Sequence, residues 1–336
     1  MNRNIFSVVL CVLPLMRSFQ AEAQQPKSIP RIGYLSRDLH PADSRAPAPR
    51  NLEAFRQGLQ ELGYIEGKNI IVEYRYAEGR FERWPALAEK LVRLKVEIIV
   101  ANDFTTVRAA RKVTTTIPII VTGGMDPVGS GFVASLARPG GNVTGLTSLA
   151  VELVGKRLEL LKEVVPKVSR FAFLTPDAEA AASKAMFEDG QAAAKTLGVK
   201  FQLVEVKGQD PDIDGAFRVM VNERIGAVIT SPAPRFNLSL HRKRILQLLE
   251  KARTPAIHPS AEWVDAGGLM YYGANTPDLH RRAAIYVDKI LRGAKPADLP
   301  VEQPTKFDLA INLKAARQIG LTIPPNVLAR ADKVIK

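Results

Sequence analysis

Short polar side chains recur directly after the predicted strands of this chain, at positions where small ligands bind in many α/β proteins. Hydroxyl and amide groups there, together with free backbone N–H groups at helix starts, suit a carboxylate or another anionic group. Asp126 or Glu262 could meet an ammonium group. The candidate ligand-binding residues are Ser36, Asn102, Thr105, Thr106, Thr122, Asp126, Ser231, Ser260, Glu262, Tyr272 and Asn275. Their types predict a site for a small polar solute.

Residue patterns typical of enzymes are missing from the sequence. It contains no Gly-x-x-x-x-Gly-Lys-Ser/Thr loop, no Gly-x-Ser-x-Gly elbow and no His-Glu-x-x-His pair. The four histidines are far apart and lack the spacing of metal ligands; they are His40, His241, His258 and His280. We therefore expect no catalytic residue, no metal and no cofactor.

The first residues read as a secretory signal peptide. Arg3 supplies a positive start, and residues 5–16 form an apolar run that is too short for a membrane span, which needs about 20 residues. Residues 21–23 read Ala-Glu-Ala, a pattern that signal peptidase accepts. We predict a signal peptide over residues 1–23 and export to the periplasm; a short anchor or a buried first strand is the alternative. The only cysteine, Cys11, lies inside this segment.

The net charge of +13 raises the question of a nucleic-acid partner. The positive residues are spread along predicted helices, and no basic strand with interleaved aromatic residues accompanies them. Solvated helix faces explain this charge, so we expect no nucleic-acid partner.

Two similar halves position the candidate residues. Residues 31–36 read Arg-Ile-Gly-Tyr-Leu-Ser, and residues 170–175 read Arg-Phe-Ala-Phe-Leu-Thr. Further similarities follow in the same order, which indicates two lobes built on one plan. The length of 336 residues allows two domains of about 150 residues each.

Strands and helices alternate in both halves, which indicates an α/β protein with two Rossmann-like lobes and parallel sheets. Strands are predicted at 32–35, 70–76, 96–101, 117–121, 143–147, 171–174, 201–206, 227–230, 256–258, 268–272 and 307–312. Helices are predicted at 51–62, 84–94, 105–114, 128–136, 178–197, 213–224, 238–251, 278–291 and 313–319. The helix at 278–291 follows after both lobes look complete, so we expect the chain to cross between lobes more than once. We predict one lobe from residues 28–147 plus 275–305 and another from 148–274 plus 306–336.

Several motifs together resemble the solute-binding proteins of ABC transporters, in the family of uncharacterised periplasmic components of which some bind tryptophan, tyrosine or phenylalanine. The matching stretches are 58–69, 117–121, 126–129, 139–145, 266–273, 295–302 and 311–316, and the resemblance covers essentially the whole chain after the signal peptide.

The resemblance implies the type I periplasmic-binding-protein fold, with three crossovers and closure of the lobes on a solute. It also implies delivery of that solute to an ABC permease with its ATPase at the inner membrane, by a protein that we expect to be a monomer. The pocket loops of the family fall on residues 102–106, 122–126, 230–232, 260–262 and 272–275. The expected solute is an amino acid, aromatic ones included, or an organic acid. A periplasmic sensor that feeds a receptor kinase and an α/β-cleft enzyme are the alternatives.

Overall fold

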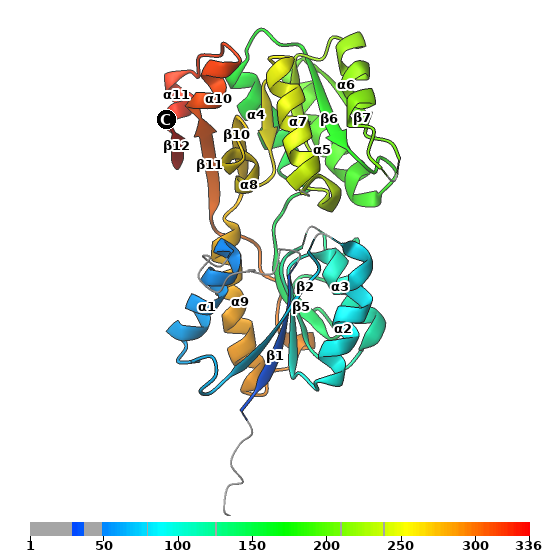
Figure 1. The fold of residues 1–336 in the computed structure, drawn as a ribbon, viewed down its shortest axis with the longest axis vertical. Coiled ribbons are helices and arrows are strands. Elements are labelled where there is room, and N and C mark those ends of the chain that lie inside the picture. Colours follow the sequence, from blue (N-terminus) through cyan, green and yellow to red (C-terminus); the bar gives the residue numbers. More distant parts are fainter. Residues whose placement is uncertain (1–28, 37–48, 79, 125, 209, 238) are drawn as a thin grey trace, which may run out of the picture.

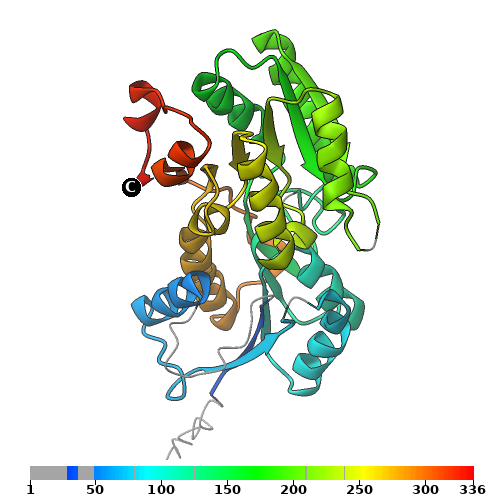
Figure 2. The same cartoon turned by 45° about the horizontal axis from the view of Figure 1, so that its top comes forward.

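The protein consists of two lobes, each built around its own β-sheet and covered by helices on both faces (Figures 1 and 2). The structure is a computed structural model that describes residues 29–36, 49–78, 80–124, 126–208, 210–237 and 239–336. The predicted signal peptide at 1–23 lies outside these residues.

The first lobe contains a five-stranded parallel sheet with the order β2-β1-β3-β4-β5. Side chains alternate across it, because successive residues of a strand point to opposite faces. Ile98 and Val100 pack on the side of α1 and α9, while Ile99 and Ala101 pack on the side of α2 and α3. Its elements are β1 (Arg31–Ser36), α1 (Arg50–Glu61), β2 (Ile71–Tyr76), α2 (Trp84–Arg93), β3 (Ile98–Ala101), α3 (Phe104–Val113), β4 (Ile119–Gly124), β5 (Val143–Thr147) and α9 (Thr276–Leu291).

The second lobe contains a seven-stranded sheet with the order β12-β11-β10-β9-β8-β6-β7. Phe171 and Phe173 face the core beneath α4 and α5, while Ala172 and Leu174 face α6 and α7. Its elements are α4 (Val154–Val164), β6 (Arg170–Thr175), α5 (Ala181–Leu197), β7 (Lys200–Glu205), α6 (Ile213–Asn222), β8 (Ala227–Thr230), α7 (Ser239–Lys251), β9 (Ala256–His258), α8 (Ala261–Asp265), β10 (Met270–Ala274), β11 (Phe307–Asn312), α10 (Leu313–Gln318), α11 (Pro325–Leu328) and β12 (Lys333–Ile335).

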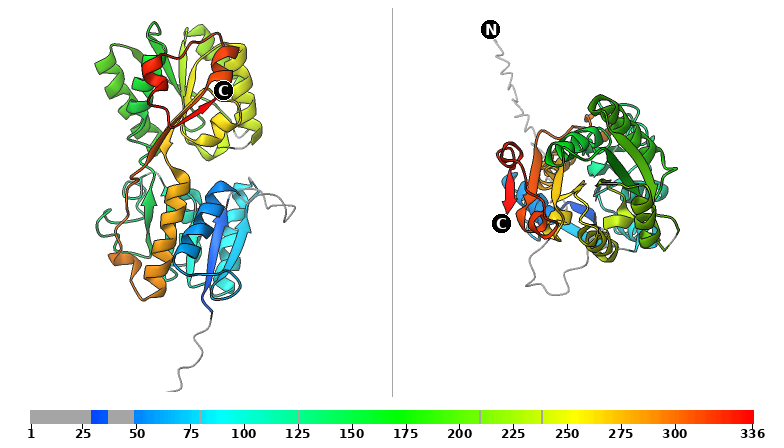
Figure 3. Two further views of the ribbon diagram at one scale, coloured as in Figure 1. Left: turned by 90° about the vertical axis from the view of Figure 1, so that its left-hand side faces the viewer. Right: turned by 90° about the horizontal axis from the view of Figure 1, so that it is seen from above.

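The chain crosses between the lobes three times: after β5, after β10 and before β11. The connecting segments pass close together between the lobes (Figures 1 and 3). The prediction of two Rossmann-like lobes with three crossovers is confirmed. One strand departs from the parallel pattern: β11 pairs with β10 in the antiparallel sense, because it re-enters the second sheet from the side of the first lobe.

The predicted helix at 128–136 is wrong, because residues 127–130 form turns instead. The backbone N–H groups of Phe132 and Val133 both donate to the carbonyl oxygen of Pro127, at 3.0 and 3.2 Å. Gly131 has a φ of +67°, which a right-handed helix does not accommodate. The apolar spacing that suggested a helix instead buries Phe132 and Val133 from an irregular loop.

Candidate functional site

Three predicted site residues form one row at the carboxyl edge of the first sheet. In the register of the sheet, Leu35 of β1 lies beside Ala101, and Ala101 lies beside Val121. The residues that follow these three are Ser36, Asn102 and Thr122, so the fold brings them together although they are far apart in the sequence. Thr105 lies half-buried in the first turn of α3, beyond the same edge.

The second sheet forms a matching row. Leu174 of β6 lies beside Thr230, and Tyr271 of β10 lies beside His258. Ser231 follows β8 directly, Ser260 is the second residue after the end of β9, and Tyr272 lies within β10, next to Tyr271. Figure 1 shows that the carboxyl edges of the two sheets face each other across the region between the lobes.

Several polar atoms in these rows are buried and lack a hydrogen-bond partner in the described part of the chain. They are Asn102 Oδ1, Asp103 Oδ2, Ser231 Oγ and Ser260 Oγ. An unsatisfied buried polar group costs about 1–3 kcal/mol. Their shared location at strand ends of both lobes therefore indicates a place where a solute, or the water that it displaces, completes the hydrogen bonding.

Three predicted site residues use their side chains in local structure. Thr106 Oγ1 donates to the carbonyl oxygen of Asp103 at 2.6 Å and belongs to a capping box at the start of α3. Asn275 caps α9 by accepting from the Asp278 N–H at 2.8 Å. The Asp126 carboxylate accepts from the Gly129 N–H, also at 2.8 Å. These bonds shape the loops around the row; whether the same side chains also touch a solute stays a prediction.

A buried histidine that the sequence did not single out supports Thr122. His280 Nε2 on α9 lies 3.1 Å from Thr122 Oγ1, and its Nδ1 lies 3.0 Å from the Tyr34 hydroxyl on β1. All three side chains are at most 1% exposed. The sequence around His280 does not predict these contacts, because the two partners lie on strands that are distant in the sequence.

Arg157 on α4 is a second residue that the sequence analysis missed. It is fully buried, and its Nε donates to the Tyr272 carbonyl oxygen at 2.8 Å. Nη1 has no partner within the described chain. Burial lowers the pKa of Arg157 to about 10, so the guanidinium still carries its charge at neutral pH. A buried cation beside the middle of β10 favours an anionic group in its surroundings. The Tyr272 ring itself stacks on Phe307 with centroids 6.2 Å apart.

A cavity of about 220 Å³ lies at the junction of the lobes. Glu262 lines it together with Asp265, Asp308 and Tyr271 from the second lobe and Arg50 from the start of α1. Arg50 Nη1 lies 3.3 Å from Asp265 Oδ2, so one ion pair connects the lobes here. Lys333 Nζ also pairs with Asp265, at 3.0 Å, so the carboxylates of Glu262 and Asp308 are the ones that suit an ammonium group here.

The described residues meet the requirements of neither a metal site nor a membrane-spanning helix. They contain no group of three or more histidine, cysteine, aspartate or glutamate side chains placed to hold a metal ion. Within the same residues, no helix has both the length and the apolar character needed to cross a membrane.

Comparisons with known proteins point to solute binding. The family described as ABC transporter substrate binding protein matches residues 48–335. A tyrosine-binding protein of Clostridioides difficile (strain R20291) is 27% identical over 261 residues, which cover 77% of this chain and 73% of that protein. The structure of the ABC domain in complex with L-Trp from Streptococcus pneumonia is 25% identical, with a TM-score of 0.79 over 92% of this chain and 100% of that chain. A conserved domain protein of Vibrio cholerae is 29% identical, with a TM-score of 0.78 over 91% and 99% of the two chains.

Proposed function

Because this chain belongs to the ABC transporter substrate-binding protein family, we propose that it captures a small polar solute between its lobes and delivers it to an ABC permease driven by an ATPase. The observation that carries the capture step is the set of unpaired polar atoms at strand ends of both lobes, from Asn102 and Asp103 on one side and Ser231 and Ser260 on the other. A solute that contacts both rows favours the closed arrangement, because only differential affinity shifts a conformational population.

The moving parts in this proposal are the predicted lobes, residues 28–147 plus 275–305 and residues 148–274 plus 306–336. The three connecting segments between them act as the hinge. Several strands in parallel restrict the motion to opening and closing, which keeps the two rows aligned.

The proposed solute is an amino acid, with an aromatic one favoured. Two related proteins are described as tyrosine-binding and as an L-Trp complex. The junction cavity supports the assignment, since the Glu262 and Asp308 carboxylates there suit an α-ammonium group. An organic acid is the second candidate, and the buried guanidinium of Arg157 is the observation that supports it.

A ligand screen on the purified protein tests this proposal. L-Trp, L-Tyr and L-Phe are compared with 4-hydroxybenzoate and citrate by thermal shift, followed by calorimetry. A solute at one hundred times its Kd stabilises the folded state by about 2.7 kcal/mol, which raises Tm by several degrees. No shift with any amino acid or organic acid at millimolar concentration would overturn the proposal.

We propose further that residues 1–23 direct export and are removed, and that the exported protein acts in the periplasm as a monomer without catalytic activity. The family supports this, since its described members bind solutes. Mass spectrometry of the protein recovered from the periplasm is expected to show an N-terminus at Gln24. An uncleaved chain retained in the cytoplasm would contradict it.

A further inference from the structure

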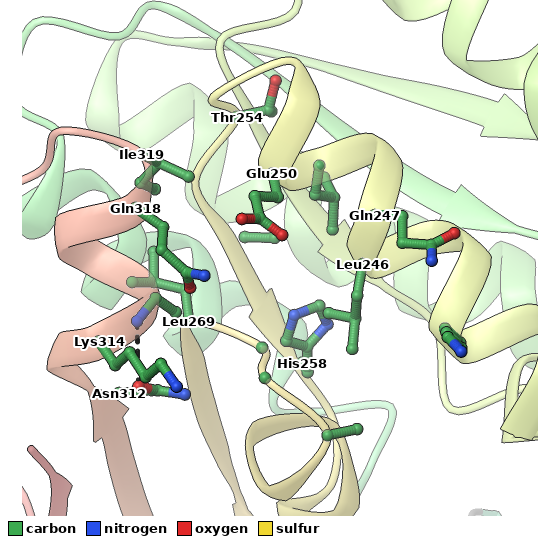
Figure 4. Close-up of a pocket in the computed structure, with 17 residues that line it drawn as sticks. Leu246, Gln247, Glu250, Thr254, His258, Leu269, Asn312, Lys314, Gln318 and Ile319 are labelled. Carbon is green, nitrogen blue, oxygen red and sulfur yellow. Dashed lines mark hydrogen bonds between the residues drawn. The ribbon is translucent and has the colours of Figure 1, made fainter.

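The connection between β9 and β10 is unusually short for the second lobe. These strands are parallel, and the helix that joins them, α8, has 5 residues, whereas α7 has 13. At about 1.5 Å per residue, α8 extends only about 8 Å, so it covers little of the sheet face beside α7. The uncovered part forms a cavity of about 320 Å³ between α7 and α10 (Figure 4). It lies within the second lobe and shares no lining residue with the junction cavity.

A buried histidine borders this cavity. His258 ends β9 and is 0% exposed. Its Nδ1 lies 3.0 Å from Thr230 Oγ1, and its ring stacks on Trp263 with centroids 4.5 Å apart and planes at 8°. Nε2 has no hydrogen-bond partner in the part of the chain that the structure describes. Burial lowers the pKa of His258 to about 3, so the imidazole is neutral near pH 7.

Gly268 keeps one edge of this ring free of a covering side chain. A Cβ on Gly268 would come within 2.9 Å of His258 Nε2 and 2.8 Å of its Cδ2. Any larger residue would therefore seal the edge that carries the unpaired nitrogen. His258 and Gly268 both line the cavity, so the ring edge that carries this buried nitrogen lies at the cavity wall.

The lining defines the chemistry of an occupant. Leu246, Leu249 and Leu269 form apolar walls, whereas charged side chains of both signs stand at the exposed mouth, Lys243 and Glu250 among them. Because the walls are apolar and no charged side chain lies inside, the cavity favours an uncharged molecule. The neutral imidazole favours one hydrogen-bonding group at the inner end, and a hydroxyl suits either tautomer because it can both donate and accept. A volume of about 320 Å³ is at the lower end for pockets that hold small molecules, which measure about 300–1,000 Å³.

We propose that the second lobe has its own binding site, separate from the interlobe site, for a small uncharged molecule with an apolar body and one hydroxyl group that hydrogen-bonds to His258 Nε2. The site does not depend on the lobes closing, because every lining residue belongs to one lobe. It is compatible with a solute bound at the same time between the lobes.

Phenol and benzene are suitable probes, because they share a ring and differ by the hydroxyl. Both are titrated into ¹⁵N-histidine-labelled protein and followed by NMR and calorimetry. We expect phenol to bind once in this cavity, about fivefold tighter than benzene as befits one net hydrogen bond, and to move the Nε2 resonance of His258. Benzene is expected to leave that resonance close to its free position.

Two exposed positions of α7 give a matched pair of variants. Gln247 lines the cavity and Lys251 does not, and both side chains are exposed. Gln247→Trp is expected to weaken phenol binding at least tenfold and to leave binding of the interlobe solute unchanged, while Lys251→Trp leaves both unchanged. Equal binding of phenol and benzene, an unmoved His258 resonance at saturation, or phenol binding that survives Gln247→Trp would each overturn the proposal.

Discussion

Thr122 Oγ1 on β4 lies 3.1 Å from Nε2 of His280 on α9, so a buried contact ties the sheet of the first lobe to the helix that returns from the second. The other ring nitrogen of His280 lies 3.0 Å from the Tyr34 hydroxyl. One imidazole therefore joins β1, β4 and α9 at the sheet edge that carries Ser36 and Asn102. This arrangement fixes the end of a hinge segment relative to the proposed solute site.

Replacing His280 with leucine is expected to destabilise the protein by about 2–4 kcal/mol, since two buried hydroxyl groups lose this partner. Thr122→Val should cost about 1–2 kcal/mol, because it removes only one of the two contacts. Urea denaturation measures both. In the double variant the costs should sum to less than the two single values, because the Thr122 contact is already lost in His280→Leu. Strictly additive costs would show that the two residues are energetically independent.

Alanine substitutions at Ser231 and Asn275 should affect different properties, solute affinity in the first case and folding stability in the second. Ser231→Ala removes a hydroxyl oxygen without a partner in the described structure, so Tm should stay within about 2 °C while affinity for the solute falls about tenfold. Asn275→Ala removes the cap of α9 and should cost about 1 kcal/mol of stability. Calorimetry and thermal melts on both variants check the contrast. A Ser231→Ala protein that binds normally would remove Ser231 from the proposed site.

The sequence predicts most elements of this fold, because the apolar strands and amphipathic helices carry their own periodicity. It also predicts which loops gather at the strand ends, since parallel sheets align those ends. It does not show that Thr106 and Asn275 cap helices, because a polar residue after a strand looks the same whether it caps or binds. Nor does it reveal Arg157 or His280, whose partners lie more than 100 residues away. The turns at 127–130 mimic helical spacing and are recognised only from the left-handed Gly131.

Gly58 sets the distance between α1 and α9. A Cβ at this position would lie 2.3 Å from the Arg281 carbonyl oxygen, which is backbone and cannot rotate away. Gly58→Ala should therefore destabilise the first lobe by more than about 2 kcal/mol, despite the higher helix propensity of alanine. Gln57→Ala, at the exposed neighbouring position, is the control and should change stability by less than about 0.5 kcal/mol. Denaturant midpoints of the two variants measure the difference. Equal midpoints would show that α1 and α9 can move apart without loss of stability.

His258 should make stability depend on pH. Its folded pKa is about 3, against 6.5 for the exposed side chain, so the unfolded chain binds a proton that the folded chain does not. The contribution of His258 to the free energy of unfolding is fully present above pH 6.5. It is lost as pH falls from 6.5 toward 3, at about 1.4 kcal/mol per pH unit. Between pH 7.5 and pH 5 the loss should reach about 2 kcal/mol. Urea denaturation at these two pH values gives the total change.

His258→Gln isolates the contribution of this histidine, because glutamine does not titrate. The variant should be less stable than the unmodified protein at pH 7.5, since it loses the stacking on Trp263 and the contact with Thr230. Its stability should nevertheless fall less on acidification, by about 2 kcal/mol, because the remaining titrating groups are the same in both proteins. If both proteins lose the same stability between pH 7.5 and pH 5, His258 takes up its proton in the folded state as readily as in the unfolded chain, and a lowered pKa of His258 is excluded.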